Sequence, residues 1–152
     1  MENRGGHYLR ELLEMLKKDL FVLEKTEASC CGMTLSQCHV ILAIGKAGEV
    51  SLNELAGLLN LDSSTISRSV DNLFNKGLVS RKVDERDRRY VRISLTEMGK
   101  EVYGEIERNL ADYFERVFSS IPEEKRHQVL ESLKLLLDAV RENRCCEEGF
   151  LW

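Results

Sequence analysis

The sequence predicts a mainly α-helical protein that carries one small β-hairpin, and three observations lead to this fold class. Hydrophobic residues make up 43% and charged residues 32% of the 152 residues, which indicates a folded, helix-rich chain. Apolar residues recur every three or four positions over most of the length, as on the buried face of a helix. Two short neighbouring segments, 78–83 and 90–95, instead have the composition of strands.

The first two predicted helices are separated by a short break. Leucines at helical spacing mark the first helix over roughly residues 8–25, and the break follows through residues 30–32. Thr34 and Gln37 form a capping box, in which the side chain of each residue bonds the backbone N–H of the other. We therefore expect the second helix to begin after Thr34 and to stop near Gly48.

Two shorter helices follow in quick succession. Ser51 and Glu54 repeat the capping box and open a third helix, and Asp62 can cap a fourth, which Gly77 ends. Two helices joined by a tight connection, the second of them amphipathic, form a helix-turn-helix arrangement. The predicted inward stripe of the fourth helix is Ile66, Val70, Leu73 and Phe74, and its outward residues are Ser63, Ser64, Thr65, Ser67, Arg68 and Asn72.

A charged loop joins the two predicted strands. Residues 84–89, with the sequence Asp-Glu-Arg-Asp-Arg-Arg, separate the strand segment 78–83 from the strand segment 90–95. A hairpin with a charged tip that directly follows a helix-turn-helix is a wing. The middle of the chain is therefore predicted to be a winged helix-turn-helix.

Charge is unevenly distributed along the chain. The formal net charge is −4, which by itself argues against nucleic-acid binding. Residues 63–92 nevertheless hold eight basic and four acidic side chains, a local balance of +4 that leaves −8 for the remainder. Such asymmetry is typical of a DNA-contacting face on an otherwise acidic protein.

Two long helices are predicted after the wing. Thr96 can cap the first of them, and Pro122 suits the first turn of the second. Their apolar stripes, with that of the first helix, exceed what one small winged domain can cover, so we expect two chains to pair about a two-fold axis. The expected parts are a dimerisation helix with its connector (1–33), a DNA-binding lobe (34–95), dimerisation helices (96–144) and a tail (145–152).

The sequence also bears on where the protein resides. No stretch approaches the ~18 consecutive apolar residues that a membrane span requires. Residues 1–10 lack the charged-then-apolar layout of a secretory signal. We therefore expect a cytoplasmic protein that has no membrane partner.

Two segments carry a resemblance to a known family. The stretch LVSRKVDERDRRYVRISLTEMGK and the preceding SLNELAGLLNLDSSTISRSVDNLFNKG resemble the MarR family of regulators. The similarity covers nearly the whole chain, apart from residues 27–32 and the tail after Arg144. It implies an intertwined homodimer that binds a palindromic operator in double-stranded DNA, usually as a repressor, and that lets go when a ligand or an oxidant binds.

The resemblance also implies roles for individual residues. The helix over residues 63–76 would enter the major groove, Arg86 would enter the minor groove, and Asp84 would hold that arginine in place. Side-chain chemistry agrees, because hydroxyls and amides bind phosphates and base edges and Arg68 can pair with guanine. An arginine at a hairpin tip suits the negative potential of a narrow minor groove. The predicted DNA-binding residues are Ser63, Ser64, Thr65, Ser67, Arg68, Asn72, Lys82, Asp84, Arg86, Arg88 and Arg89.

The candidate sensing or metal-binding residues are the five cysteines, Cys30, Cys31, Cys38, Cys145 and Cys146. Three convergent thiolates near the second helix would suit a soft ion such as Zn²⁺ or Cu(I), or a trivalent metalloid. A thiolate near a helix N-terminus can instead be oxidised and then resolved by a neighbouring cysteine. The structural alternative makes Cys38 a small buried hydrophobe and the last pair a solvated chain end. No CxxC pair is present, so a standard structural zinc site is not predicted.

Three other interpretations compete with a thiol-dependent regulator. A small aromatic or phenolic anion can release DNA instead, in a cleft lined by Tyr8, Phe21, Met33 and His39, unless these side chains are ordinary core. An enzyme is not predicted, because no GxSxG, P-loop, HExxH or dinucleotide motif is present. A winged domain that binds only proteins would be expected to have lost its wing arginines, and all three are present.

Overall fold

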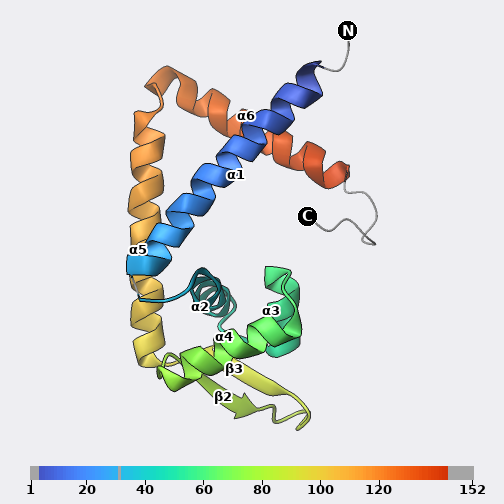
Figure 1. Ribbon diagram of the computed structural model, residues 1–152, viewed down its shortest axis with the longest axis vertical. Coiled ribbons are helices and arrows are strands. Elements are labelled where there is room, and N and C mark those ends of the chain that lie inside the picture. Colours follow the sequence, from blue (N-terminus) through green and yellow to red (C-terminus); the bar gives the residue numbers. More distant parts are fainter. Residues whose placement is uncertain (1–3, 31, 144–152) are drawn as a thin grey trace. The chain divides into compact units, whose positions relative to one another are not determined.

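The computed structural model describes residues 4–30 and 32–143, and it confirms a mainly helical fold with a small antiparallel sheet. The chain divides into two compact units, Met1–Asn109 and Leu110–Trp152. No helix within the described ranges is long and apolar enough to cross a membrane. The elements are α1 (Arg4–Cys30), α2 (Leu35–Ala47), β1 (Glu49–Ser51), α3 (Leu52–Leu59), α4 (Ser63–Asn75), β2 (Val79–Val83), β3 (Val91–Leu95), α5 (Glu97–Ser120) and α6 (Glu123–Glu142) (Figure 1).

Both predicted capping boxes are formed, so α2 and α3 begin where the sequence predicts. Thr34 Oγ1 accepts from the Gln37 N–H at 3.2 Å, and Gln37 Oε1 accepts from the Thr34 N–H at 3.3 Å. Ser51 Oγ accepts from the Glu54 N–H at 3.2 Å, and Glu54 Oε2 accepts from the Ser51 N–H at 2.7 Å. Each box satisfies two backbone donors that would otherwise lack a partner.

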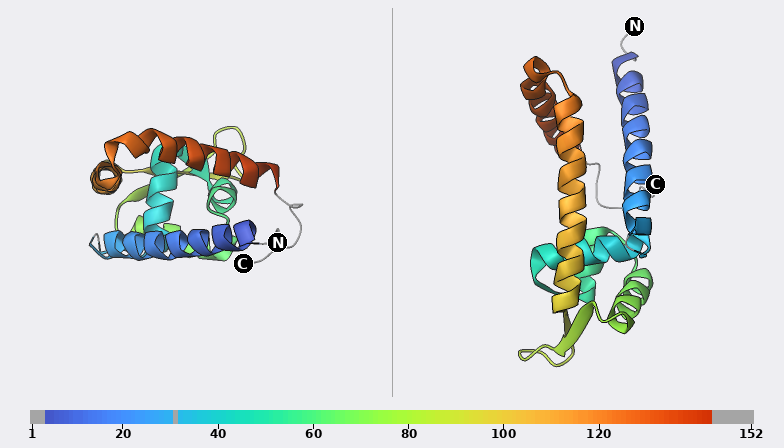
Figure 2. Two further views of the ribbon diagram at one scale, coloured as in Figure 1. Left: turned by 90° about the horizontal axis from the view of Figure 1, so that it is seen from above. Right: turned by 90° about the vertical axis from the view of Figure 1, so that its left-hand side faces the viewer.

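The sheet has three strands instead of the predicted two. β1 pairs antiparallel with β3, with Val50 opposite Ile93, and β2 pairs with the other edge of β3. β1 has three residues, which is too short for an alternating pattern to reveal it. The wing formed by β2, β3 and their loop projects from the cluster of α2, α3 and α4 (Figure 2). The additional strand joins this wing to the residues that precede α3.

The core of the first unit is built from α2, α3, α4 and the sheet. From α4, Ile66, Val70 and Leu73 are fully buried, as predicted. The prediction is wrong for Phe74, which is 46% exposed, because its ring packs against the guanidinium of Arg81 at 4.8 Å. The other fully buried large side chains are Val40, Ile41 and Ile44 of α2, Leu55 of α3, Val79 of β2 and Ile93 of β3.

Close packing fixes the start of α5. Thr96 Oγ1 donates to the Gly77 carbonyl at 2.6 Å and accepts from the Gly99 N–H at 3.0 Å. One hydroxyl therefore joins the turn after α4 to the first turn of α5. A Cβ on Gly99 would lie 1.9 Å from the Leu78 carbonyl oxygen, and Gly77 has a φ of +73°. Both positions therefore require glycine.

Apolar side chains are exposed on α1 and, separately, on α6. α1 extends beyond both ends of the predicted segment 8–25. On each helix these residues recur at three- and four-residue spacing and so lie along one face, whereas an ordinary monomer surface exposes apolar residues singly. The exposed apolar residues include Leu9 (41% exposed), Leu12 (44%) and Leu16 (46%) on α1, and Leu130 (54%), Leu133 (44%) and Leu137 (55%) on α6.

Candidate nucleic-acid interface

Helix α4 is held against α2 so that one polar face points outward. The hydroxyl oxygens of Ser36 and Ser69 lie 2.8 Å apart between the two helices. At the end of α4, Lys76 Nζ donates to the Gly32 carbonyl and to Gln37 Oε1, both at 3.3 Å. The outward residues Ser63, Ser64, Arg68 and Asn72 are exposed, and Thr65 and Ser67 are half-buried beside them.

The Asp62 carboxylate organises the first turn of α4. Its Oδ2 accepts from the Ser64 hydroxyl and from the Thr65 N–H at 3.1 Å, and its Oδ1 accepts from the Thr65 hydroxyl at 2.6 Å. The bond from Ser64, followed by those from Thr65, holds the pKa of Asp62 well below its usual range. Sequence reasoning identified Asp62 only as a helix cap. It missed that this carboxylate accepts hydrogen bonds from the hydroxyls of Ser64 and Thr65, which are two of the predicted DNA contacts.

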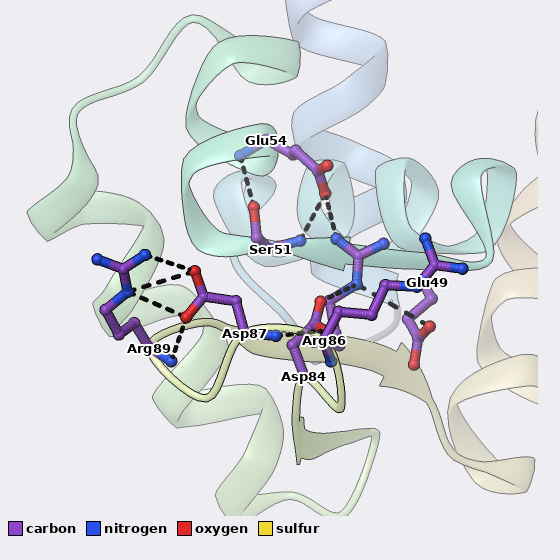
Figure 3. A network of polar contacts seen from close by, with 8 residues as sticks. Glu49, Ser51, Glu54, Asp84, Arg86, Asp87 and Arg89 are labelled. Carbon is purple, nitrogen blue, oxygen red and sulfur yellow. Dashed lines mark hydrogen bonds and ion pairs between the residues drawn. The ribbon is translucent and has the colours of Figure 1, made fainter.

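Asp84 organises the wing loop through backbone bonds (Figure 3). Its Oδ1 accepts from the N–H of Arg86 at 2.7 Å and from the N–H of Asp87 at 3.3 Å, which closes a tight turn. The Asp84 N–H donates to the Tyr90 carbonyl at 2.9 Å across the hairpin. The resemblance implies that Asp84 holds Arg86 in place. In the structure Asp84 contacts the backbone N–H of Arg86, and Arg86 is exposed.

Arg92 connects the wing to β1 and α3. Its guanidinium lies 3.1 Å from Glu54 Oε2, 3.9 Å from Asp84 Oδ2 and 4.0 Å from Glu49 Oε2. The Ser51 N–H is the main cause that lowers the pKa of Glu54, and the charge of Arg92 adds to it. Sequence reasoning missed this cluster because Glu54 and Arg92 are 38 positions apart, and only the pairing of β1 with β3 brings them together.

Ion pairs divide the basic residues of this surface into two groups. Arg81 pairs with Asp71, and Arg89 pairs with Asp87 at 2.8 Å. Four other cations on α4 and the wing are exposed, and no ion pair in the described part of the chain involves them. These four, the unpaired cations, are Arg68, Lys82, Arg86 and Arg88.

The structure brings several predicted DNA contacts to one end of the first unit. α4 and the wing lie at the same end (Figure 1). Beside the wing, Lys82, Asp84 and Arg86 line a cavity of about 510 Å³ together with Glu49 and Arg92. Both acidic and basic side chains therefore line this cavity.

Comparison with known proteins identifies the family. A sequence profile of the MarR family matches residues 32–89. The HTH-type transcriptional regulator SarZ of Staphylococcus epidermidis is 31% identical over 105 residues, which cover 68% of this chain and 68% of SarZ. The chain belongs to the MarR family. This MarR-family protein is a DNA-binding transcriptional regulator, which confirms the prediction from the sequence.

Other MarR-family similarities extend over most of the chain. The transcriptional repressor MdtR of Bacillus subtilis is 27% identical over 120 residues, which cover 79% of this chain and 75% of MdtR. The crystal structure of Streptococcus pneumoniae FabT in complex with DNA has a TM-score of 0.77 at 24% identity, covering 90% of this chain and 97% of FabT. The likeness to FabT confirms the winged helix fold of this MarR-family chain.

Cys38 of this MarR-family protein lies on α2 and is 5% exposed. The side chain of Cys30, together with Cys31, Cys145 and Cys146, lies outside the described residues. Among the side chains that the structure does describe, no three His, Cys, Asp or Glu residues are grouped to hold a metal ion. A sensing or metal site at the cysteines therefore stays a prediction.

The four residues considered for an aromatic-ligand cleft lie in different environments. Met33 is 8% exposed and His39 is half-buried, whereas Tyr8 and Phe21 on α1 are 62% and 54% exposed. The alternative of ordinary core is therefore wrong for Tyr8 and Phe21 in the single chain. His39 and Lys46 line a mostly apolar cavity of about 410 Å³ formed by residues of α2 and α3.

Proposed function

We propose that this MarR-family protein is a repressor that binds a palindromic operator as a homodimer, with α4 in the major groove and the wing in the minor groove. The observation that carries the proposal is the set of unpaired cations, Arg68, Lys82, Arg86 and Arg88, beside arginines that ion pairs neutralise. Exposed cations without a carboxylate partner are the groups that phosphates and a narrow groove attract. MdtR, which is named a repressor, supports the direction of regulation.

On α4, the long side chains in the middle of the exposed face are the candidate base contacts. Arg68 and Asn72 are four positions apart, so they lie on one face of the helix. An arginine can make two bonds to guanine, and an asparagine can make two bonds to adenine. Ser63 and Ser67 flank these residues and suit phosphate oxygens.

On the wing, the turn closed by Asp84 presents Arg86 and Arg88 at the tip. Both are exposed, which suits entry into the minor groove. Lys82 lies near the loop end of β2 and suits a phosphate. Arg89 is already paired with Asp87, so it is expected to contribute less than its neighbours.

Dimerisation and the division of the chain are part of the same proposal. The exposed leucines of α1 and α6 are covered if a second copy packs on them. Residues 1–33 and 96–144 then form the dimer, residues 34–95 form the DNA-binding lobe, and residues 145–152 form a tail. Two such lobes related by a two-fold axis match a palindrome with half-sites about one helical turn apart.

The first experiment measures binding to the DNA upstream of the protein's own gene by fluorescence anisotropy. Arg86→Ala is expected to weaken binding about 10-fold or more, because a charge-assisted contact is lost. Lys82→Ala is expected to reduce the slope of log affinity against log salt by about 1. Arg89→Ala and Arg108→Ala, the latter on α5, serve as matched controls with smaller expected effects. Unchanged affinity of Arg86→Ala at physiological salt would remove the wing from the interface.

We further propose that a thiol-directed signal, a soft metal, a metalloid or an oxidant, releases the DNA. Two cysteines precede α2 and Cys38 lies within it, so a change at these thiols acts on a helix that Ser36 and Gln37 bond to α4. The alternative effector is a small aromatic anion, and the cavity with Lys46 and His39 on its lining favours it.

The release experiment compares reduced protein with protein exposed separately to peroxide, zinc, copper(I), arsenite and salicylate-like anions. Release by one thiol reagent that is lost on Cys→Ser replacement supports the thiol signal and identifies its chemistry. Release by aromatic anions alone, retained by the Cys→Ser variants and lost in Lys46→Gln, supports the alternative.

A further inference from the structure

The first turn of α4 presents hydrogen-bond acceptors outward. Each serine or threonine hydroxyl has one proton to donate and two lone pairs that accept. The hydroxyls of Ser64 and Thr65 both donate that proton to the Asp62 carboxylate, which is an acceptor only when ionised. Their remaining capacity toward solvent is therefore to accept.

Because Asp62 is ionised, the hydroxyls of Ser64 and Thr65 keep donating their hydrogen bonds to it. The bonds from Ser64 and Thr65 lower its pKa, so the carboxylate is fully ionised at neutral pH. Asp62 and Ser64 are exposed, and Thr65 is half-buried. Asp62, Ser64 and Thr65 therefore combine a negative charge with accepting lone pairs, which disfavours phosphates and base carbonyls as partners of these three side chains.

We propose that Asp62, Ser64 and Thr65 determine sequence specificity by accepting a hydrogen bond from the exocyclic amino group of cytosine or adenine. The inference rests on the proposed docking of α4 in the major groove. There, cytosine N4 and adenine N6 are the donors, whereas guanine and thymine offer only acceptors and the thymine methyl group. The chemistry of the turn therefore selects amino-bearing bases.

One helical turn later, the exposed face of α4 changes from groups that accept hydrogen bonds to a group that donates them. Arg68 is four positions after Ser64 on the same face, and it is one of the unpaired cations. It donates only, so it selects the acceptors of guanine. A rise of about 1.5 Å per residue places the two groups roughly 6 Å apart along the helix. Each half-site is therefore expected to hold an amino-bearing base and, roughly two base pairs away on either strand, a guanine.

The test begins with selection of binding sites for the full-length chain from duplexes with a randomised half-site. The cytosine or adenine enriched opposite the first turn of α4 is then replaced by pyrimidin-2-one or by purine, which lack only the amino group. Loss of one hydrogen bond is expected to reduce affinity about 3- to 10-fold. One of the variants Ser64→Ala and Thr65→Val removes the oxygen that accepts this bond. In that variant, replacing the base should cause no further loss of affinity.

The Asp62→Asn variant tests the role of the carboxylate. An amide has one accepting oxygen instead of two, so at least one hydroxyl proton is freed to donate. Selection by this variant is expected to shift toward thymine or guanine, and its affinity for random duplex should rise because a negative charge is lost. Asp112→Asn on α5 makes the same change in net charge and should alter neither the selected bases nor the effect of removing the amino group. Thermal unfolding of each variant verifies that it is folded.

Two results overturn the inference while the proposed function stands. One is selection of thymine or guanine by the unmodified chain at these positions, and the other is an amino-group effect that both Ser64→Ala and Thr65→Val retain in full. If the chain shows no sequence preference for any duplex, the inference and the proposed function both fail.

Discussion

At the residue scale, Arg92 places one cation among three carboxylates that belong to three elements. Its side chain is 29% exposed, and it contacts Glu54 of α3, Asp84 of the wing and Glu49 of β1. Surface ion pairs contribute little to stability, typically about 0–1 kcal/mol, so the folded state does not depend on this cluster. Its effect is on where the wing lies relative to α3, so we expect Arg92 to act as a positioning residue for the proposed interface.

Arg92→Gln is expected to weaken DNA binding roughly 3- to 10-fold, because a loosened wing must be ordered when it binds. Hydrogen exchange of residues 84–90 should accelerate, while the salt dependence of binding stays the same. Glu54→Gln is the control that separates positioning from charge, because glutamine can still complete the capping box. Glu54→Gln removes a negative charge, which by itself would strengthen DNA binding. We nevertheless expect it to weaken binding, because it removes the ion pair with Arg92. Tighter binding by Glu54→Gln would show that Arg92 acts only through its charge.

The depressed pKa of Asp62 predicts how stability varies with pH. A carboxyl whose pKa is lowered by folding contributes stability above its unfolded value and loses it only as pH falls through the lower folded value. The unfolded value is near 3.8, so the stability gap between the natural chain and Asp62→Ala should be constant from about pH 7 to about pH 5. Urea unfolding from about pH 7 to about pH 3 measures it, and the gap should narrow once the pH falls below the unfolded value. A gap that stays constant down to about pH 3 would mean that the bonds from Ser64 and Thr65 are not made in solution, because the folded and unfolded pKa of Asp62 would then be equal.

At the scale of elements, the start of α5 depends on contact with the backbone of the preceding turn. Gly99→Ala would place its Cβ 1.9 Å from the Leu78 carbonyl oxygen, which is backbone and cannot move aside. We expect a loss of at least about 2 kcal/mol in the free energy of unfolding. Gly57→Ala on α3 meets nothing within 4 Å and should gain about 0.5–1 kcal/mol. Equal effects of the two substitutions in urea unfolding would contradict this packing.

The elements were predictable from the sequence to the extent that local bonds define them. Thr34 with Gln37 and Ser51 with Glu54 lie three positions apart, and both boxes form as predicted. β1 was missed because its partner Ile93 is distant in the sequence and three residues show no period. The basic composition of the candidate interface was predictable as well. Which cations are neutralised was not, because pairs such as Arg81 with Asp71 depend on how β2 packs against α4.

At the scale of the whole molecule, the exposed apolar faces predict that the active species is a dimer. Sedimentation should give twice the chain mass of 17.5 kDa. Leu133→Asp, on the apolar stripe of α6, is expected to shift the mass to that of one chain and to abolish operator binding. Leu135→Asp makes the same substitution on the opposite face of α6 and should remain dimeric. A natural chain that sediments as a monomer would contradict the proposed assembly.

In the proposed interface, the carboxylate at the start of α4 also affects how the protein searches a chromosome. A regulator meets roughly 10⁶–10⁹ competing sites for each operator, and nearly all attraction to those sites is electrostatic. Asp62 repels every phosphate equally, but its hydroxyl partners regain a bond only at the right base. Residence on random DNA is therefore shortened more than residence on the operator. If α4 binds the operator as proposed, a negative charge at its start favours fast sampling of the genome over affinity for it.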